Sequence, residues 1–314
     1  MVRQTLTLSS APPLVLAGPT AAGKSDLAVQ IALRCNGLVI CGDSRQLYSG
    51  MQIGAASPSI LAKETVPHLG FGSRPAEPPQ DANGFIHDAD LWVKQAQAQQ
   101  KQPIIVGGAG LYLRAFRFGL NDVPKSDPTI RAQLATELEK HGLASMHDKL
   151  KLVDPMGAAA IHQNDPVRVI RSLELFRITG TPPSQLRTSH AGRDVRVQAK
   201  WVLLEASMAW LGHRLRQRVE EMFTDGLVQE AVALRGQLGA SHRLLDTMGY
   251  QEALKLNDGL LSEDEAIQET YRRHRQFARR QRTWFQKETW WQRVPAESSD
   301  LADQVLSLTD LAKS

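Results

Sequence analysis

The stretch LAGPTAAGKSDL, residues 16–27, decides the fold that the sequence predicts. Its central part, residues 18–25, fits the P-loop pattern G-x-x-x-x-G-K-[ST]. An apolar run before it (14–18) predicts a strand, and helical spacing after it (26–34) predicts a helix. A glycine-rich turn between a strand and a helix is the setting in which this pattern binds phosphate groups, so a phosphate site is expected here.

The residue types of this loop explain how it would hold a diphosphate. Gly18 and Gly23 allow a tight turn that points backbone N–H groups at phosphate oxygens, and the helix N-terminus adds a partial positive charge. Lys24 supplies a full positive charge, and the Ser25 hydroxyl is the expected ligand of Mg²⁺. The predicted diphosphate-binding residues are Gly18, Thr20, Ala21, Ala22, Gly23, Lys24 and Ser25.

Strand and helix patterns alternate through the first third of the chain. Apolar runs at 37–42 and 103–108 predict two more strands, and residues 88–102 have a helical pattern. Residues 73–84 are rich in proline and glycine and predict a loop. Strands that alternate with helices over short connections form parallel sheets. The expected fold class is therefore α/β, a P-loop NTPase-like parallel sheet flanked by helices.

Two helical patterns, at 129–142 and 165–180, follow with no strand pattern between them. A strand pattern returns only at 197–206, and the chain beyond it is mostly helical to about residue 290. A helical block between two strand-bearing stretches predicts an inserted domain. We expect the insert at 122–196, within a core formed by 1–121 and 197–314.

The composition is that of an ordinary folded protein, with 42% hydrophobic residues, 22% charged residues and a formal net charge of +4. Cys35 and Cys41 form neither a CxxC pair nor a zinc-ligand set, which favours a reducing compartment. No apolar run is long enough to span a bilayer, and residues 1–13 lack the apolar core of a secretory signal. We therefore expect a cytoplasmic protein without membrane contact, acting as a monomer.

Two further strand ends carry candidate ligand contacts, because doubly wound sheets bind ligands at the carboxyl ends of their strands. Asp43 directly follows a strand run, where its carboxylate could accept a proton, bind Mg²⁺ through water, or cap the next turn. Gly107, Gly108 and Gly110 lie at the end of another and permit close approach of the backbone to a ligand. A P-loop binds pyrophosphate and does not by itself indicate which group is transferred. The sequence has no Asn-Lys-x-Asp motif, which would have indicated a guanine nucleotide.

The segment YRRHRQFARRQRTW, residues 271–284, has six arginines and no acidic residue. Arg272, Arg275, Arg279 and Arg282 recur at steps of three and four, so they share one helix face. Such a face favours contact with nucleic-acid phosphates, which positions RNA without reading its sequence. The alternative is a solvated basic face.

Ordered motifs along nearly the whole chain resemble the bacterial tRNA dimethylallyltransferase (tRNA isopentenyltransferase) family. GPTAAGKS resembles the family's P-loop, and GDSRQLYSGMQIG (42–54) resembles its DSRQxYxGxDIGTAKP segment. The remaining motifs follow in the family's order: PIIVGGAGLYLRA (103–115), IHQNDPVRVIRSLELFRITG (161–180), RLRQRVEEMFTDGLVQE (214–230), MGYQEAL (248–254) and RQFARRQRTWF (275–285).

This family alkylates N6 of the adenosine 3′ of the anticodon, with dimethylallyl diphosphate as donor. The resemblance therefore implies this activity, with tRNA and dimethylallyl diphosphate as partners and Mg²⁺ as cofactor. It also implies that Asp43 accepts the proton of the adenine amine and that Lys24 and Arg218 neutralise the departing pyrophosphate. The implied catalytic residues are Asp43, Lys24 and Arg218, and the implied tRNA-binding residues are Ser44 and Gln46, which lie against the target base, with Arg272, Arg275, Arg279, Arg282 and the insert.

The chain departs from the family's motifs near the expected site. Ala109 replaces the threonine of VGGTGLY, Ala55 and Ser57 replace a threonine and a lysine of IGTAKP, and Gly72 stands at the aspartate of PHHLID. Because of these replacements, one alternative function is that of a tRNA-binding homologue with weak or lost transferase activity. A P-loop kinase or prenyl transferase for free adenine nucleotides is a second alternative, although such a small substrate needs neither the basic helix nor the insert.

Overall fold

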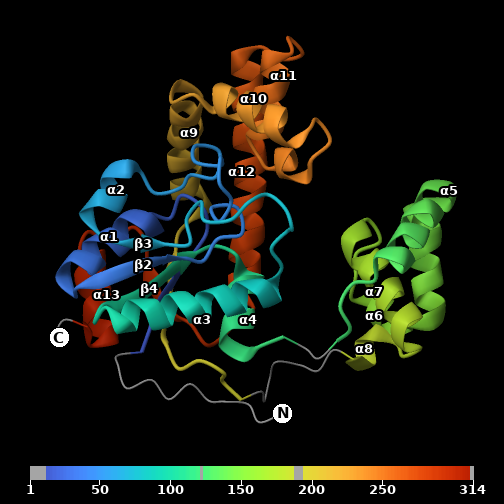
Figure 1. Ribbon diagram of the computed structural model, residues 1–314, viewed down its shortest axis with the longest axis horizontal. Coiled ribbons are helices and arrows are strands. Elements are labelled where there is room, and N and C mark those ends of the chain that lie inside the picture. The colour runs from blue at the N-terminus through green and yellow to red at the C-terminus, as the bar shows by residue number, and fades with distance from the viewer. Residues whose placement is uncertain (1–11, 121–122, 187–193, 312–314) are drawn as a thin grey trace. The chain divides into compact units, whose positions relative to one another are not determined.

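The computed structural model describes residues 12–120, 123–186 and 194–311 (Figure 1). The chain divides into two compact units, one of Met1–Arg117 with Val195–Ser314 and one of Phe118–Asp194. The sequence patterns place this division at 122 and 196. The first unit contains the sheet and the C-terminal helices, and the described residues of the second form helices without a strand.

Within the described residues, six parallel strands form one sheet in the order β3-β2-β4-β1-β5-β6. The parallel α/β sheet that the sequence predicts is confirmed. The two edge strands were not predicted, because β3 has only two residues and β6 has only one buried residue, Val294. The strands are β1 (Leu14–Ala17), β2 (Gly37–Cys41), β3 (His68–Leu69), β4 (Gln102–Gly107), β5 (Lys200–Glu205) and β6 (Gln292–Pro295).

Helices cover both faces of this sheet, so its central strands are apolar without alternation. Successive side chains of a strand point to opposite faces. Leu14 and Leu16 accordingly pack with one set of helices, while Val15 and Ala17 pack with the other. The first set includes α1 (Lys24–Arg34) and α13 (Leu301–Thr309), and the second includes α3 (Ala82–Ala98) and α4 (Gly110–Phe118) (Figure 1).

The start of α3 differs from the sequence prediction. The helix begins at Ala82 rather than at residue 88, so its first turn occupies the end of the predicted loop 73–84. Asp81 explains the earlier start, because its carboxylate accepts a hydrogen bond from the Gly84 N–H at 2.7 Å and caps the helix. The helix ends at Ala98, and the residues predicted to complete it lead into β4 instead.

A second layer of helices stands at the carboxyl side of the P-loop strand. Helix α12 is 24 residues long and begins with a capping box between Ser262 and Glu265. It runs beside α9, and the two helices pack with α10 and α11 around a core that includes Tyr250 (Figure 1). The elements of this layer are α9 (Met208–Thr224), α10 (Leu227–Leu238), η1 (Arg243–Asp246), α11 (Tyr250–Asn257) and α12 (Glu263–Gln286). The short helix α2 (Ile60–Thr65) does not belong to it and directly precedes β3 in the chain.

The insert unit has its own core, formed by side chains such as Leu134, Met146 and Leu173. Its buried Glu174 accepts hydrogen bonds from Ser126 Oγ and the Asp127 N–H, which fixes the start of the unit. The predicted break 181–194 contains a short helix, and residues 187–193 lie outside the described residues. The helices are α5 (Pro128–Val153), kinked at Gly142, α6 (Pro155–Ala159), α7 (Pro166–Thr179) and α8 (Pro183–Leu186).

Hydrophobic membrane spans are not found in the described ranges, where every helix is too short or too polar to cross a bilayer. This observation concerns helices only.

Two glycines provide a test of the packing between strand ends. A Cβ at Gly107 would clash with the backbone carbonyl of Gly42, whereas nothing lies within 4 Å of a Cβ at Gly236 on the exposed side of α10. Gly107→Ala should lower the free energy of unfolding by about 3 kcal/mol or more. Gly236→Ala should raise it by about 0.5 to 1 kcal/mol through helix propensity. Urea denaturation measures both, and a Gly107→Ala variant as stable as the parent would contradict this packing.

Candidate active site

A cavity of about 720 Å³ opens at the carboxyl ends of β1, β2 and β4. It lies within the first unit and brings together segments far apart in sequence. Its walls include the P-loop, the turn that begins at Asp43, the segment 52–59, Ala109 and Arg218. One face of α12 completes it, with Arg273, His274, Phe277, Arg280 and Gln281.

The P-loop has the conformation that its glycines allow. Gly23 has φ 80° and directly precedes α1, a backbone angle that favours glycine. Arg214, from α9, donates a hydrogen bond from Nε to the Ala21 carbonyl at 2.9 Å and holds the loop from outside. Lys24 Nζ donates to the Pro19 carbonyl at 2.7 Å, so the ammonium lies across the loop.

Asp43 caps the turn after β2 and also lines the cavity. Its Oδ1 accepts a hydrogen bond from the Arg45 N–H at 2.8 Å and caps the turn after β2. Its Oδ2 has no hydrogen-bond partner among the described residues, and Asp43 lines the cavity. The carboxylate is therefore fixed through one oxygen while the other can accept a proton.

Three charged groups at the cavity act on one another. Burial and the neighbouring Arg218 lower the pKa of Lys24 to about 8, and Asp43 opposes this shift. Burial, followed by Arg214, also lowers the pKa of Arg218, whose Nη1 lies 3.5 Å from Thr20 Oγ1. Confined cations favour an anionic ligand, because the ligand supplies the missing countercharge.

Gln281 is a site residue that the sequence analysis missed. Its Oε1 accepts a hydrogen bond from the Thr20 N–H at 2.8 Å, and its Nε2 donates to the Gly108 carbonyl at 3.0 Å. A Cβ at Gly108 would clash with this amide, so the glycine permits the contact. Within the basic segment, a glutamine among arginines gives no signal of a buried position; only its place on the face of α12 opposite the exposed arginines could have indicated one.

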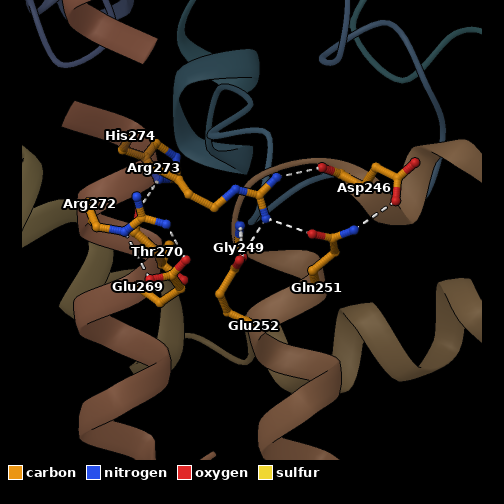
Figure 2. A network of polar contacts seen from close by, with 9 residues as sticks. All are labelled: Asp246, Gly249, Gln251, Glu252, Glu269, Thr270, Arg272, Arg273 and His274. Atoms are coloured by element: carbon orange, nitrogen blue, oxygen red, sulfur yellow. Dashed lines mark hydrogen bonds and ion pairs between the residues drawn. The ribbon is translucent and has the colours of Figure 1, made fainter. Parts of the chain in front are cut away.

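An ion pair between the partly buried Arg273 and the buried Glu252 holds the wall formed by residues 246–248 (Figure 2). Arg273 reaches from α12 to Glu252 Oε1 at 2.6 Å and to the Asp246 carbonyl at 2.9 Å. Glu252 is 2% exposed, and its other oxygen accepts from the Gly249 N–H at 2.9 Å. One arginine thus fixes the connection between η1 and α11 against the long helix.

His274 lies next to this pair on α12 and faces the cavity (Figure 2). Its Nδ1 is 3.0 Å from the Thr270 carbonyl. Burial is the main cause that lowers the pKa of His274 to about 4, so the ring is neutral near pH 7 and donates its Nδ1 hydrogen to that carbonyl.

The basic segment does not present six equivalent arginines. Arg272 pairs with Glu269, three residues earlier, at 2.5 Å, and Arg273 pairs with Glu252. Arg275 and Arg279 are exposed and form no ion pair with the described residues. The sequence analysis found no acidic residue within this segment, but acidic residues outside it form ion pairs with Arg272 and Arg273. The expectation of a helix face of unpaired arginines is therefore corrected for Arg272.

The departures from the family's motifs have different structural contexts. Ala109 lines the cavity directly before α4, where a threonine would add a hydroxyl. Ala55 and Ser57 lie in the segment 52–59, and Ser57 Oγ donates to the Met51 carbonyl at 3.3 Å. Gly72 has φ 62°, so its backbone conformation suits glycine better than aspartate.

Comparisons with known proteins agree with this geometry. The family model "IPP transferase" matches residues 46–288. A tRNA dimethylallyltransferase of Anaeromyxobacter sp. (strain Fw109-5) is 38% identical over 294 residues, which cover 93% of this chain and 98% of the relative. The chain belongs to the IPP transferase family. The resemblance seen in the sequence is thereby confirmed.

Further relatives extend the IPP transferase likeness to structure. A tRNA dimethylallyltransferase of Geobacter sulfurreducens is 36% identical and spans 92% of this chain and 94% of the relative. The tRNA isopentenylpyrophosphate transferase of Bacillus halodurans matches with a TM-score of 0.67 at 30% identity, over 97% of this chain and 96% of that one. A eukaryotic dimethylallyltransferase acting on tRNA has a TM-score of 0.76 at 25% identity, over 96% and 78%.

The predicted site residues stay predictions in this family setting, but their positions are defined. All three predicted catalytic residues line the one cavity, as do Ser44 and Gln46. Arg282 lies elsewhere, in a second cavity beside Phe285 and Pro19. Arg282 is partly buried, whereas Arg275 and Arg279 are exposed.

The pKa of Lys24 gives a testable pH dependence. Because this pKa is lowered to about 8, the ammonium in the ligand-free protein loses its proton as the pH rises through that value. Affinity for Mg²⁺-pyrophosphate should therefore be constant below about pH 7 and fall by up to tenfold per pH unit above about pH 8. Calorimetry measures it, with Lys24→Met in parallel to subtract the ligand's own titration. A constant ratio of the two affinities across this range would contradict the assignment.

Proposed function

We propose that the protein transfers a dimethylallyl group from dimethylallyl diphosphate to N6 of the adenosine 3′ of the anticodon in tRNA, releasing pyrophosphate. The observation that carries the proposal is one cavity that holds a P-loop, Asp43 and Arg218 together. The family membership supports the same activity. The cytoplasmic location and the monomeric state expected from the sequence stay predictions.

The reaction needs one bond to form and one to break. The adenine N6 attacks the allylic carbon C1, and the bond between C1 and the diphosphate oxygen breaks with its electron pair on oxygen. N6 then carries one proton too many, and Asp43 Oδ2 accepts it. The hydrogen bond from the Arg45 N–H to Oδ1 keeps the carboxylate oriented, so only Oδ2 changes its bonding.

The P-loop, Lys24 and Arg218 would stabilise the leaving pyrophosphate. Pyrophosphate gains negative charge as the carbon–oxygen bond breaks, and preorganised donors aimed at that charge lower the barrier. Lys24 and Arg218 would supply two of the positive charges at the cavity, and the P-loop backbone would supply N–H groups. Binding of the anion should also restore the ordinary pKa of Lys24.

The residues present fit a Mg²⁺ ion held mainly through phosphate oxygens. Ser25 and Asp43 line the same cavity and offer the oxygen ligands that Mg²⁺ prefers. Across the described residues no cluster of three or more His, Cys, Asp or Glu side chains could hold a metal alone. Bound in this way, Mg²⁺ would neutralise charge on the diphosphate.

The tRNA substrate would be held by arginines at the protein surface and, at its target base, by residues in the cavity. Arg275 and Arg279 are exposed on α12, and in this proposal they would meet the phosphates. Ser44 and Gln46 line the cavity, so a base that leaves its stack would meet them there. Contact of the insert with tRNA is part of the same proposal.

Replacing Asp43 tests the chemistry. Asp43→Asn keeps an oxygen that can accept from the Arg45 N–H but cannot take up a proton. Single-turnover transfer of labelled dimethylallyl to unmodified tRNA should fall by about 10² or more, with pyrophosphate affinity little changed. AMP should not replace tRNA as the acceptor.

Two outcomes would favour the alternatives. The missing hydroxyl at Ala109, which lines the cavity, is the observation that favours a homologue that binds tRNA without catalysing the transfer. Wild-type protein that binds tRNA tightly and transfers nothing would support that reading and overturn the proposal. Efficient transfer to AMP would instead favour an enzyme for free nucleotides.

The two exposed arginines predict a salt dependence. The double variant Arg275→Gln/Arg279→Gln should reduce the slope of log affinity for tRNA against log salt by about 1.5 to 2, because fewer counterions are released. The matched control is Arg272→Gln/Glu269→Gln, which removes an ion pair without changing the net charge. Its slope should equal that of the wild type. Equal slopes for all three proteins would show that this face of α12 does not lie on phosphates.

A further inference from the structure

The segment 52–57 forms a turn that has its own anchor outside the site. Within it the Ala56 N–H donates to the Ile53 carbonyl, and the Ser57 N–H donates to the Gln52 carbonyl, each at 2.9 Å. The turn lines the cavity next to Gln46. Its outer side meets α10.

Glu230 of α10 receives the backbone of this turn. Its carboxylate accepts hydrogen bonds from three successive N–H groups, those of Gln52 at 2.9 Å, Ile53 at 2.8 Å and Gly54 at 2.9 Å. A carboxylate has enough lone pairs for all of them, and charged acceptors form the stronger hydrogen bonds. The side chain thus clamps the start of the turn.

Tyr250, from α11, contacts the Glu230 carboxylate as well. Its hydroxyl donates to Glu230 Oε1 at 2.7 Å, and the ring is fully buried. Burial and the Glu230 charge raise the pKa of this phenol, so it remains a donor near pH 7. Gly54 packs so closely on the ring that a Cβ there would clash with it.

The inner side of the turn fixes the orientation of Gln46. The Gln46 Nε2 group donates to the carbonyls of Ala55 at 3.0 Å and Ala56 at 2.8 Å. Both acceptors are carbonyls, so only the NH₂ end of the amide can face them. Its Oε1, which accepts no hydrogen bond from the described residues, is left as an acceptor at the cavity. Since the contacts use backbone oxygens, the alanine at position 55 does not remove them.

We propose that Glu230 is a positioning residue for the target base: by holding the 52–57 turn, it keeps the Gln46 Oε1 directed at a purine that carries an amino group at position 6. This inference rests on the proposed function, because it takes adenine as the base in the cavity. An acceptor there pairs with the adenine amine and opposes the carbonyl of hypoxanthine. Glu230 itself touches no substrate.

A double-mutant cycle tests whether Glu230 acts through Gln46. Glu230→Gln puts an NH₂ group against backbone N–H donors, and the freed turn should let the Gln46 amide rotate. Single-turnover transfer to tRNA should fall by about tenfold or more in Glu230→Gln and in Gln46→Ala. The double variant should be no slower than Gln46→Ala, because the two changes remove the same contact. Losses that multiply would overturn the proposal.

Base preference gives a readout that needs no turnover. Wild-type protein should bind tRNA with adenosine at the target position several-fold more tightly than tRNA with inosine there. Glu230→Gln should bring this ratio close to one, whereas a merely structural role would weaken both affinities equally. A preference that survives in Glu230→Gln would refute the positioning role. If wild-type protein transfers nothing, the proposed function fails, and this ratio still decides the role of Glu230.

The controls separate positioning from folding. Tyr250→Phe keeps the three backbone hydrogen bonds and should stay within about threefold of wild type. Glu220→Gln makes the same chemical change at an exposed position of α9 and should leave the rate and the base preference unchanged. Glu230→Gln should melt at a lower temperature, because its NH₂ group faces N–H donors, but it should unfold cooperatively and keep a pyrophosphate affinity near that of the wild type. Loss of pyrophosphate affinity in this variant would mean that the whole site has collapsed and would count against a local clamp.

Discussion

The two hydrogen bonds of one amide, that of Gln281, join the parts of the site that the chain itself keeps far apart. The amide links α12 to the P-loop at Thr20 and to the turn after β4 at Gly108. The sheet brings those two turns to neighbouring positions, since β1 and β4 are paired. The amide then adds the C-terminal helix, so the cavity has a wall that the sheet alone cannot supply.

That wall explains the electrostatic state of the site. With α9 and α12 covering the strand ends, Lys24 and Arg218 are taken out of water and their pKa values fall. Keeping Lys24 and Arg218 charged in the ligand-free protein therefore costs free energy, and an anionic ligand reduces this cost. A leaving pyrophosphate has more charge than the bound diphosphate ester at the reacting oxygen, so the same arrangement favours the transition state.

Side chains away from the chemistry do much of the positioning. Glu252 and Arg273 fix the wall at residues 246–248, and Glu230 fixes the turn at 52–57. The Glu230 carboxylate accepts hydrogen bonds from three backbone N–H groups and the Glu252 carboxylate from one, and each connects a helix to a loop that lines the cavity. Loops held in this way can present substrate contacts with the precision of a helix or strand.

The sequence by itself determined the parallel sheet and the phosphate loop, because both depend on local patterns: apolar runs, helical spacing and a glycine-rich turn. It also placed Asp43 at the carboxyl end of a strand, the edge at which doubly wound sheets bind their ligands. Tertiary structure alone decided which polar residues share the cavity. Gln281 and Glu230 have partners 261 and 176 to 178 residues away, and Arg273 is paired with Glu252, 21 residues away. No local pattern encodes such pairs, since hydrogen bonds and ion pairs depend on distance in space, and distance in space is set only when the helices pack.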